Sequence, residues 1–377
     1  MAGIYIHIPF CKQACYYCDF HFSTNQSLKE ELIHAISLEL SYQKDYLQGE
    51  RIETIYFGGG TPSLLAKREL DVIFNSIYKH YSVIPLPEIT LEANPDDLDK
   101  EKIITLKETG INRISLGIQS FDDVVLKFLN RAHTGEDALA CVSQLREHEI
   151  DNLSIDLIHS IPGQDDETLR RNLEKVITLA PQHVSVYSLT IEEKTVFGKW
   201  SLRGQLKAVE ETQSAGQFEL VMDTLTGSSY QHYEISNFCL PGLSSKHNTS
   251  YWQQKKYLGV GPSAHSFDLE SRQFNVSNNH LYMKSIHEGK IPYEKEILTR
   301  ENKINEYIFT SLRTRQGCHL SYLTNHYDYD LKKVNSDYIQ SLLKLGYVTL
   351  IDEILILTRQ GKLMADKIAS DLFASLE

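Results

Sequence analysis

Three cysteines lie close together near the start of the chain, in the segment IHIPFCKQACYYCDFHF of residues 6–22. Cys11, Cys15 and Cys18 have the spacing Cys-x3-Cys-x2-Cys. Thiolates with this spacing can ligate zinc or an iron–sulfur cluster. A structural zinc ion takes four protein ligands, and His21 could supply the fourth. A [4Fe–4S] cluster held by three cysteines would instead leave one iron open to a small molecule. Zinc knuckles usually draw cysteine pairs from two separate turns, which favours the cluster here.

The cysteines follow the first of several short apolar runs that alternate with amphipathic stretches up to about residue 190. The predicted strands are rich in Ile, Val and Tyr, and they cover residues 4–8, 54–59, 88–93, 113–119, 153–159 and 183–189. Helical patterns lie between them, for example at 28–43 and 138–149. This alternation predicts an α/β fold with a parallel sheet. Periodicity alone does not distinguish a doubly wound sheet from a barrel.

Polar and glycine-rich segments follow the predicted strands, at residues 58–62, 92–97, 119–121 and 160–164. In barrels and open α/β sheets alike, the carboxyl ends of the strands carry the active site. Taken singly, such glycines and prolines also mark ordinary turns between strand and helix. Taken together with the cysteines, they predict one site at this edge of the sheet.

The rest of the chain has a different pattern. Periodicity is weak from about 230 to 300, and the glycines of 257–267 suggest a tight turn over the open end of a barrel. A helix near 300–313, a helical run at 336–346 and two β runs within 347–358 predict a small winged-helix module. With few basic residues in its helical run, this module is expected to serve structure or protein docking.

Composition excludes several classes of protein. The chain has 377 residues and a formal net charge of −12, which argues against an extensive basic surface for binding nucleic acid. No run of residues is long and apolar enough for a transmembrane segment, and the N-terminus does not resemble a signal peptide. Six unevenly spaced cysteines favour a reducing cytoplasm. Cys141 is expected in a helical core, and Cys239 and Cys318 in loops without a role.

The motifs carry a family resemblance. Cys-x3-Cys-x2-Cys after the first predicted strand, with GGGTP after the second, resembles the radical S-adenosylmethionine superfamily. More narrowly, YIHIPFC, GGGTPS, LEANPDD, RISLGIQSF and IDLIHSIPGQ resemble the oxygen-independent coproporphyrinogen III oxidase family over nearly the whole chain. The resemblance implies a partial (β/α)6 barrel at about 1–230, a connecting region at 231–300 and a winged-helix-like domain at 301–377.

The resemblance also implies roles for individual residues. Cys11, Cys15 and Cys18 would ligate a [4Fe–4S] cluster whose open iron chelates the methionine moiety of S-adenosylmethionine. Tyr5, Gly59 and Glu92 would bind that S-adenosylmethionine, with Glu92 accepting a hydrogen bond from its ammonium group. A second S-adenosylmethionine site would be lined by Tyr17, Gly60, Thr61, Gln119, Arg131 and Asp156.

The chain departs from the oxidases at two points. Phe20 stands where they carry a fourth cysteine, and the cluster loop begins almost at the N-terminus. Both departures match a sister group of haem chaperones, as does HNTSYW at 247–252. That resemblance implies that His247 is an axial haem ligand and that Tyr251 and Trp252 pack against the porphyrin.

The expected function is therefore that of a cytoplasmic haem chaperone. It would bind haem, a cluster and S-adenosylmethionine and pass haem to an acceptor protein. One alternative is a radical enzyme that decarboxylates coproporphyrinogen III, which Phe20 argues against. Another is a radical enzyme that acts on an unrelated substrate.

Overall fold

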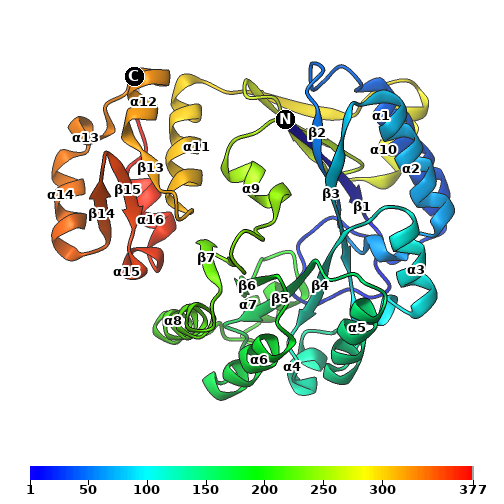
Figure 1. The fold of residues 1–377 in the computed structure, drawn as a ribbon, viewed down its shortest axis with the longest axis horizontal. Coiled ribbons are helices and arrows are strands. Elements are labelled where there is room, and N and C mark those ends of the chain that lie inside the picture. The colour runs from blue at the N-terminus through cyan, green and yellow to red at the C-terminus, as the bar shows by residue number, and fades with distance from the viewer. Residues whose placement is uncertain (376–377) are drawn as a thin grey trace.

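The computed structural model describes residues 1–375, and its main feature is a curved sheet of twelve strands (Figure 1). Residues 376 and 377, the end of the predicted C-terminal domain, lie outside the described residues. Six adjacent strands run parallel in chain order: β1 (Ala2–Ile8), β2 (Ile52–Gly59), β3 (Val83–Ala93), β4 (Arg113–Gln119), β5 (Leu153–His159) and β6 (His183–Ser188). They confirm the six strands and the parallel sheet predicted from the sequence, and they form a partial barrel.

The parallel strands carry apolar side chains on one face and polar or aromatic side chains on the other. In β1, Ile4, Ile6 and Ile8 are fully buried in the main hydrophobic core. Tyr5 pairs in register with Tyr56 of β2, and their rings stack at 6.1 Å between centroids. Because successive strand residues point to opposite faces, the isoleucines pack beneath the helices and the tyrosines face the barrel interior. That interior is consequently available for polar chemistry.

Eight helices follow the strands between β1 and β7 along the chain, and most of them cover the outer face of the sheet (Figure 1). They are α1 (Lys29–Tyr42), α2 (Lys67–His80), α3 (Lys100–Glu108), α4 (Asp123–Phe128), α5 (Gly135–Glu147), α6 (Asp166–Leu179), α7 (Val196–Leu202) and α8 (Glu211–Gly227). α5 begins at a capping box, in which Thr134 Oγ1 accepts from the Asp137 amide and the Asp137 carboxylate accepts from the Thr134 amide. Cys141 lies on α5 and is buried in the core, as predicted.

The weakly periodic segment after residue 230 extends the sheet at both edges. β7 (Gln231–Glu234) and β8 (Asn237–Cys239) form a hairpin beside β6. β9 (Tyr257–Val260) pairs parallel with β1, and β10 (His265–Phe267), β11 (Ser271–Asn275) and β12 (Tyr293–Ile297) continue antiparallel. α10 (Asn279–His287) lies between β11 and β12 in the chain and packs on α1.

The glycines of 257–267 have two different uses. The tight turn expected there joins β9 to β10: Gly261 has a φ of +100°, and its carbonyl accepts from the Ala264 amide at 3.2 Å. Gly259 lies inside β9, where a Cβ atom would overlap the backbone of His265. This glycine allows two chain segments to approach closely, which is a different use of a missing side chain from a tight turn.

A small C-terminal module follows, as predicted. Its helices are α11 (Arg300–Leu312), α12 (Leu320–Tyr327), α13 (Leu331–Val334), α14 (Ser336–Leu345), α15 (Arg359–Lys362) and α16 (Ala365–Asp371). Its antiparallel sheet has the order β13 (Cys318–His319), β15 (Ile354–Leu357), β14 (Val348–Ile351). The β14–β15 hairpin turns at Asp352 and Glu353, which both have positive φ, as a two-residue type I′ turn requires. Cys239 and Cys318 were expected in loops but lie buried in β8 and β13.

α9 (Lys246–Trp252) lies between the barrel and the C-terminal module (Figure 1). It packs against β1 and β2 on one side and against α11 on the other. The guanidinium of Arg313, just after α11, lies over the Trp252 ring at 5.6 Å. A second contact between the barrel and the C-terminal module joins α15 to α8: Arg359 forms ion pairs with Glu219 and Asp223 at 2.8 Å each.

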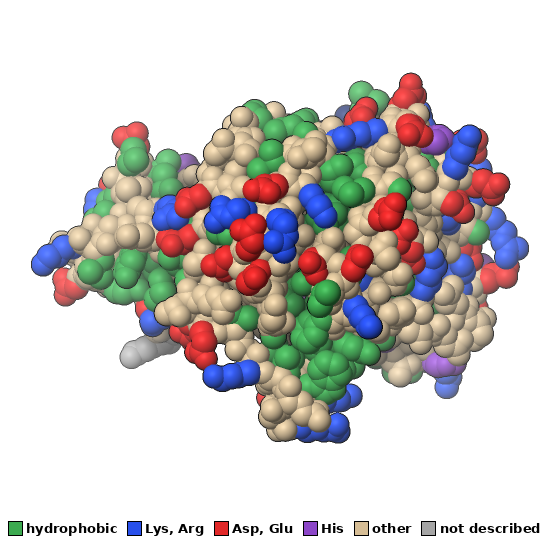
Figure 2. Space-filling model, turned by 90° about the horizontal axis from the view of Figure 1, so that it is seen from below, with side chains coloured by type: hydrophobic (Ala, Val, Ile, Leu, Met, Phe, Trp, Pro, Cys, Tyr) green, Lys and Arg blue, Asp and Glu red, His purple; other side chains and the backbone are tan. Residues whose placement is uncertain are grey.

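The surface mixes charges of both signs. On the face drawn in Figure 2, acidic and basic side chains are interspersed around apolar side chains. Within residues 1–375, no helix combines the length and the apolar character needed to cross a membrane.

Candidate cofactor site

A cavity of about 540 Å³ lies at the carboxyl ends of the parallel strands. We call it the cysteine cavity. Most of the predicted site residues line it: Cys11, Cys15, Tyr17, Cys18, Gly59, Gly60, Thr61, Glu92, Gln119, Arg131 and Asp156. Tyr5 and His247 are not among its lining residues. The parallel sheet brings these distant segments together because the carboxyl ends of its strands share one edge.

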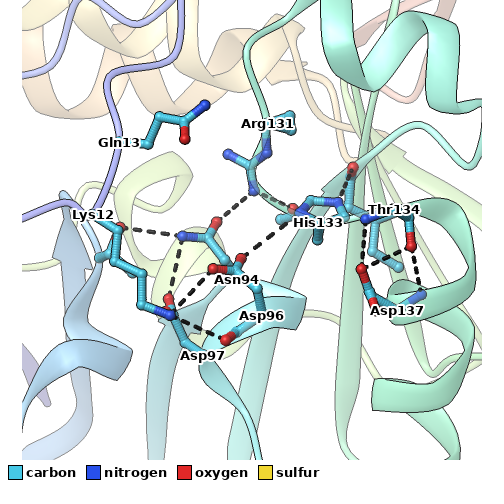
Figure 3. A network of polar contacts seen from close by, with 12 residues as sticks. Lys12, Gln13, Asn94, Asp96, Asp97, Arg131, His133, Thr134 and Asp137 are labelled. Carbon is cyan, nitrogen blue, oxygen red and sulfur yellow. Dashed lines mark hydrogen bonds and ion pairs between the residues drawn. The ribbon is translucent and has the colours of Figure 1, made fainter.

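The loop that carries the cysteines is fixed to the neighbouring strand ends. Lys12 Nζ donates to the Asp96 carbonyl at 3.0 Å and forms ion pairs with the carboxylates of Asp96 and Asp97 (Figure 3). On the other side of the loop, Asn130 Nδ2 donates to the Ala14 carbonyl at 2.7 Å. The cysteines therefore project from a loop held at both sides.

Each of two cysteine sulfurs accepts a hydrogen bond from the cavity wall. Thr61 Oγ1 donates to Cys11 Sγ at 3.5 Å, and Arg131 Nη1 donates to Cys15 Sγ at 3.3 Å. Burial raises the pKa of Cys11 to about 11 and that of Cys18 to about 12. These two thiols are thus protonated near neutral pH without a metal, and ligation of iron would release their protons.

His21, the alternative fourth ligand for zinc, is engaged elsewhere. Its Nε2 atom lies 2.7 Å from Asn279 Oδ1, on α10, and its carbonyl lies 3.0 Å from His7 Nε2. Among residues 1–375, no group of three or more His, Cys, Asp or Glu side chains is arranged to hold a single metal ion. In a cluster each cysteine ligates a different iron, so the sulfurs need not converge on one point. The donor set therefore fits a cluster better than a zinc knuckle.

Glu92 presents a buried carboxyl group to the cysteine cavity. Its Oε1 accepts from the Tyr56 hydroxyl at 2.8 Å, and its Oε2 accepts from the Gly59 amide at 3.1 Å. Burial, aided by the nearby Asp156 carboxylate, raises the pKa of Glu92 to about 7 in spite of the Tyr56 hydrogen bond. Such a carboxyl group gains most from a cationic ligand, because the cation would favour its ionised form.

Two of the glycines that line the cysteine cavity are used for close packing. Gly59 has a φ of +104°, and a Cβ atom there would lie 2.5 Å from His7 Cε1. At Gly60 a Cβ atom would lie 2.7 Å from the Phe10 carbonyl oxygen. Both positions therefore exclude larger residues for steric reasons.

Arg131 supplies a positive charge beside Cys15. Its Nη2 donates to the Gly117 carbonyl at 2.6 Å and to Asn94 Oδ1 (Figure 3). These bonds leave Nη1 directed at the sulfur of Cys15. The guanidinium is therefore placed to offset the charge of a thiolate.

Asp156 and Gln119 complete the far wall of the cavity. The Asp156 carboxylate accepts from Ser115 Oγ at 3.0 Å and from Ser154 Oγ at 3.2 Å, and burial raises its pKa. Gln119 ends β4 with a φ of +68°, in the left-handed region. Both side chains could contact a second ligand above the cysteines.

Tyr5 lies behind the cavity wall. Its ring stacks on Tyr56, and its hydroxyl lies 3.2 Å from His7 Nδ1. Tyr56, on which Tyr5 stacks, lines the cysteine cavity and donates to Glu92, whereas Tyr5, which was predicted to bind S-adenosylmethionine, does not line it.

His247 is 1% exposed and lies inside the barrel. Its Nδ1 lies 2.7 Å from Thr54 Oγ1, and its Nε2 lies 2.8 Å from the Tyr251 hydroxyl. Its ring stacks on Tyr56 at 4.9 Å between centroids. Burial lowers the pKa of His247 to about 3, so the ring is neutral at physiological pH. Both ring nitrogens are thus already hydrogen-bonded.

Known proteins are similar in sequence to this chain over most of its length. The model of the radical SAM superfamily matches residues 5–176, and that of the HemN C-terminal domain matches residues 298–364. The heme chaperone HemW of Lactococcus lactis is 36% identical over 90% of this chain and 88% of its own. The heme chaperone HemW of Bacillus subtilis is 34% identical over 98% of both chains.

The chain belongs to the HemW family of radical SAM proteins. Its fold is that of a solved relative outside the HemW family. The structure titled coproporphyrinogen III oxidase (HemN) from Escherichia coli, a radical SAM enzyme, superposes with a TM-score of 0.85 at 22% identity. The match covers 100% of this chain and 90% of that one.

The site of this HemW family member includes residues that the sequence reasoning missed. Lys12, Asp97 and Asn130 hold the loop that carries the cysteines, and Asn94 and Tyr56 orient Arg131 and Glu92. The motif LEANPDD contained a signal for Asn94 and Asp97, because it places polar side chains directly after a buried strand. No local signal marked Tyr56, which reads as an ordinary strand residue.

Proposed function

We propose that this protein is a haem chaperone that binds a [4Fe–4S] cluster, S-adenosylmethionine and haem, and that it delivers haem to an acceptor protein. The observation that carries the proposal is the identity of 34% over 98% of both chains to a protein named heme chaperone HemW. Such coverage includes the barrel, the α9 segment and the C-terminal module together. We place the protein in the cytoplasm, in keeping with its six free cysteines.

In this proposal Cys11, Cys15 and Cys18 hold the cluster. The cluster would supply an open iron for the methionine moiety of S-adenosylmethionine and, when reduced, an electron. Glu92 would accept a hydrogen bond from the ammonium group of that ligand, and Arg131 would offset thiolate charge at Cys15. Contacts of Lys12 and Asn130 hold the loop that carries the cysteines before any ligand binds, which reduces the entropy lost on binding.

A radical decarboxylase is the second candidate. The observation in its favour is that Gln119, Arg131 and Asp156 line the same cavity as the cysteines, where a substrate could meet the ligand of the open iron. Phe20 argues against it, since the oxidases resemble this chain but carry cysteine there. Phe20 is 72% exposed and lines the cysteine cavity without providing a ligand atom.

An anaerobic haem titration of the cluster-reconstituted protein tests the proposal. We expect saturable binding of one haem per chain, followed by transfer of that haem to an added haem-free acceptor. The same preparation, given coproporphyrinogen III, S-adenosylmethionine and a reductant, should form no vinyl product. Decarboxylation without saturable haem binding would contradict the chaperone proposal and support the radical decarboxylase instead.

A further inference from the structure

Arg113 is an arginine buried inside the barrel. It begins β4, which lies between the strands that carry Glu92 and Asp156. Ile114 and Leu116 of the same strand are fully buried in the hydrophobic core, so Arg113 faces the barrel interior by alternation. Arg113 itself is only 2% exposed. A charge in such surroundings is costly unless other groups compensate it.

The neighbours of Arg113 on β3 do not compensate its charge. Its Nη2 atom is buried without a hydrogen-bond partner, and among residues 1–375 its guanidinium forms no ion pair. Thr90, which lies opposite Arg113 on β3, is fully buried, and its Oγ1 atom has no partner either. Glu88, two residues before Thr90, accepts from the amides of Lys246 and His247 instead. The compensating charge must therefore act from a greater distance.

Two buried carboxyl groups supply that charge. Glu92 and Asp156 line the cysteine cavity, on the strands at either side of β4. Burial raises the pKa of both acids, and the positive charge of Arg113 acts against that rise through space. Without a nearby cation, two interacting carboxyl groups in a buried site would not both be ionised near neutral pH, because like charges raise each other's pKa.

The other titratable groups around these three charges are neutral near pH 7. Burial, together with the positive charge of Arg113, lowers the pKa of His183 and that of His247. Arg131, which also lines the cysteine cavity, is directed at Cys15. Burial raises the pKa of the tyrosines that face the three charges from neighbouring elements, namely Tyr5, Tyr56, Tyr187, Tyr233 and Tyr251. Arg113 is consequently the cation that serves the two acids.

We propose that Arg113 is a positioning residue for S-adenosylmethionine, because its charge keeps Glu92 and Asp156 ionised together. The proposal rests on the proposed binding of S-adenosylmethionine and adds a residue to that site. Glu92 can then accept a hydrogen bond from the ligand ammonium while Asp156 remains a carboxylate. The ammonium and Arg113 would each offset one of the two negative charges. Arg113 does not line the cysteine cavity, so it acts through the two acids and not by contact with the ligand.

The pH dependence of S-adenosylmethionine binding tests this role. Anaerobic calorimetric titration of the cluster-loaded protein gives the Kd of Arg113→Met and of wild type at each pH. If loss of the cation raises the pKa of Glu92 by about one unit, the ratio of the two Kd values should grow from no more than about twofold at pH 9 to about tenfold at pH 6. Titration of the ligand itself affects both proteins equally and cancels in this ratio. An equal ratio at every pH would show a purely structural role and overturn the proposal.

Two further variants are the controls for this titration. Arg113→Lys keeps the positive charge and should keep the wild-type pH profile, whereas a profile like that of Arg113→Met would contradict a role of the charge. Arg146→Met removes a half-buried arginine of α5 that donates to the Ala180 carbonyl at 3.2 Å, away from the cysteine cavity. Its Kd ratio to wild type should stay close to one. A ratio that grows at low pH in this variant would contradict a specific role of Arg113.

Infrared spectroscopy of the cluster-loaded protein without S-adenosylmethionine tests the charge state of the acids directly. At about pH 8 exposed carboxyl groups are ionised, so the carbonyl-stretch band of a protonated carboxyl group reports buried acids. This band should be stronger in Arg113→Met than in wild type, and a second substitution, Glu92→Gln, should weaken it again. Equal bands in folded Arg113→Met and wild type would overturn the proposal.

Wild-type protein decides the question if Arg113→Met does not fold. Glu92→Gln and Asp156→Asn in the wild-type background should each leave the band nearly unchanged, because both acids are ionised beside Arg113. Loss of one full carboxyl group from the band in either variant would mean that this acid is protonated in spite of Arg113, and would overturn the proposal.

These results separate the role of Arg113 from the function on which it rests. Wild-type protein that binds S-adenosylmethionine, with a Kd ratio that does not depend on pH, would leave the proposed function intact and remove the role of Arg113. Wild-type protein that binds no S-adenosylmethionine would overturn the proposed ligand, and the infrared band would still show whether Arg113 keeps both acids ionised.

Discussion

The Tyr56 hydroxyl donates a hydrogen bond of 2.8 Å to Glu92 while the Tyr56 ring stacks on His247 at 4.9 Å. One aromatic side chain thereby connects the carboxyl group of the cysteine cavity with the buried histidine of α9. His247 in turn contacts Tyr251. Glu92, Tyr56, His247 and Tyr251 consequently form one continuous series of contacts inside the barrel.

Binding of S-adenosylmethionine should depend on pH through Glu92. The pKa of this buried carboxyl group is raised to about 7, and the ligand ammonium requires its ionised form. Protonation therefore competes with binding, so the Kd should be constant above about pH 8 and rise by up to about tenfold per pH unit below 7. Isothermal titration of the cluster-loaded protein between pH 6 and 8.5 measures this slope.

Glu92→Gln is the matched control for that titration. Glutamine has nearly the same shape as glutamate but no ionisable group. The variant should bind S-adenosylmethionine more weakly, and its Kd should no longer rise below pH 7. An equal slope in wild type and Glu92→Gln would assign the pH dependence to another group.

Cys15→Ala should lose the cluster. Three thiolates are the smallest protein ligand set for a cluster with one open iron, and Cys15 also accepts the hydrogen bond from Arg131. Iron and acid-labile sulfide analysis after anaerobic reconstitution measures the loss. Cys141→Ala is the control, because Cys141 is buried in α5 away from the cysteine cavity and should leave the cluster content unchanged. Full iron and sulfide content in Cys15→Ala would remove this cysteine from the ligand set.

Gly59→Ala should destabilise the protein. A positive φ costs about 1–2 kcal/mol for a residue with a Cβ atom, and the overlap with the His7 ring adds about 1–3 kcal/mol. Urea unfolding compared with wild type measures the free energy of unfolding. Gly216→Ala, in α8, is the control: nothing lies within 4 Å of its Cβ position, so it should stabilise by up to about 1 kcal/mol. Equal stability of Gly59→Ala and wild type would show that His7 moves aside freely.

Phe20→Ala should keep its cluster and its stability. Phe20 is 72% exposed and provides no ligand atom, so the free energy of unfolding should change by about 0.5 kcal/mol or less. Iron analysis and urea unfolding test both expectations. Phe57→Ala, at a fully buried phenylalanine of β2, should by contrast cost about 3–5 kcal/mol. Loss of iron from Phe20→Ala would mean that this side chain shields or shapes the cluster site.

Local pattern was sufficient for the parallel strands and the C-terminal hairpin, whereas most residues of the cysteine cavity were predicted from the family resemblance. Alternating side-chain direction puts Ile4 and Ile6 in the core and Tyr5 in the barrel, whatever the neighbouring strands are. Glycine and polar residues at strand ends likewise identify the edge of a sheet before its strand order is known. The strands β9–β12 escaped prediction because they have only three to five residues each, and β12 is exposed along its whole length.

The sequence by itself determined the cysteine spacing, the polar ends of the parallel strands and the family to which the chain belongs. Only the tertiary structure decided the surroundings of His247. Its contact with Thr54 joins residues 193 positions apart, and such a contact depends on how α9 packs into the barrel. The cavity lined by Tyr251, Trp252, Phe309 and Phe373 has the same origin, because its walls come from segments that meet only when the C-terminal module packs against α9 and the sheet edge. Residue types and local spacing specify which groups are present, whereas packing between distant segments specifies which of them a ligand can reach.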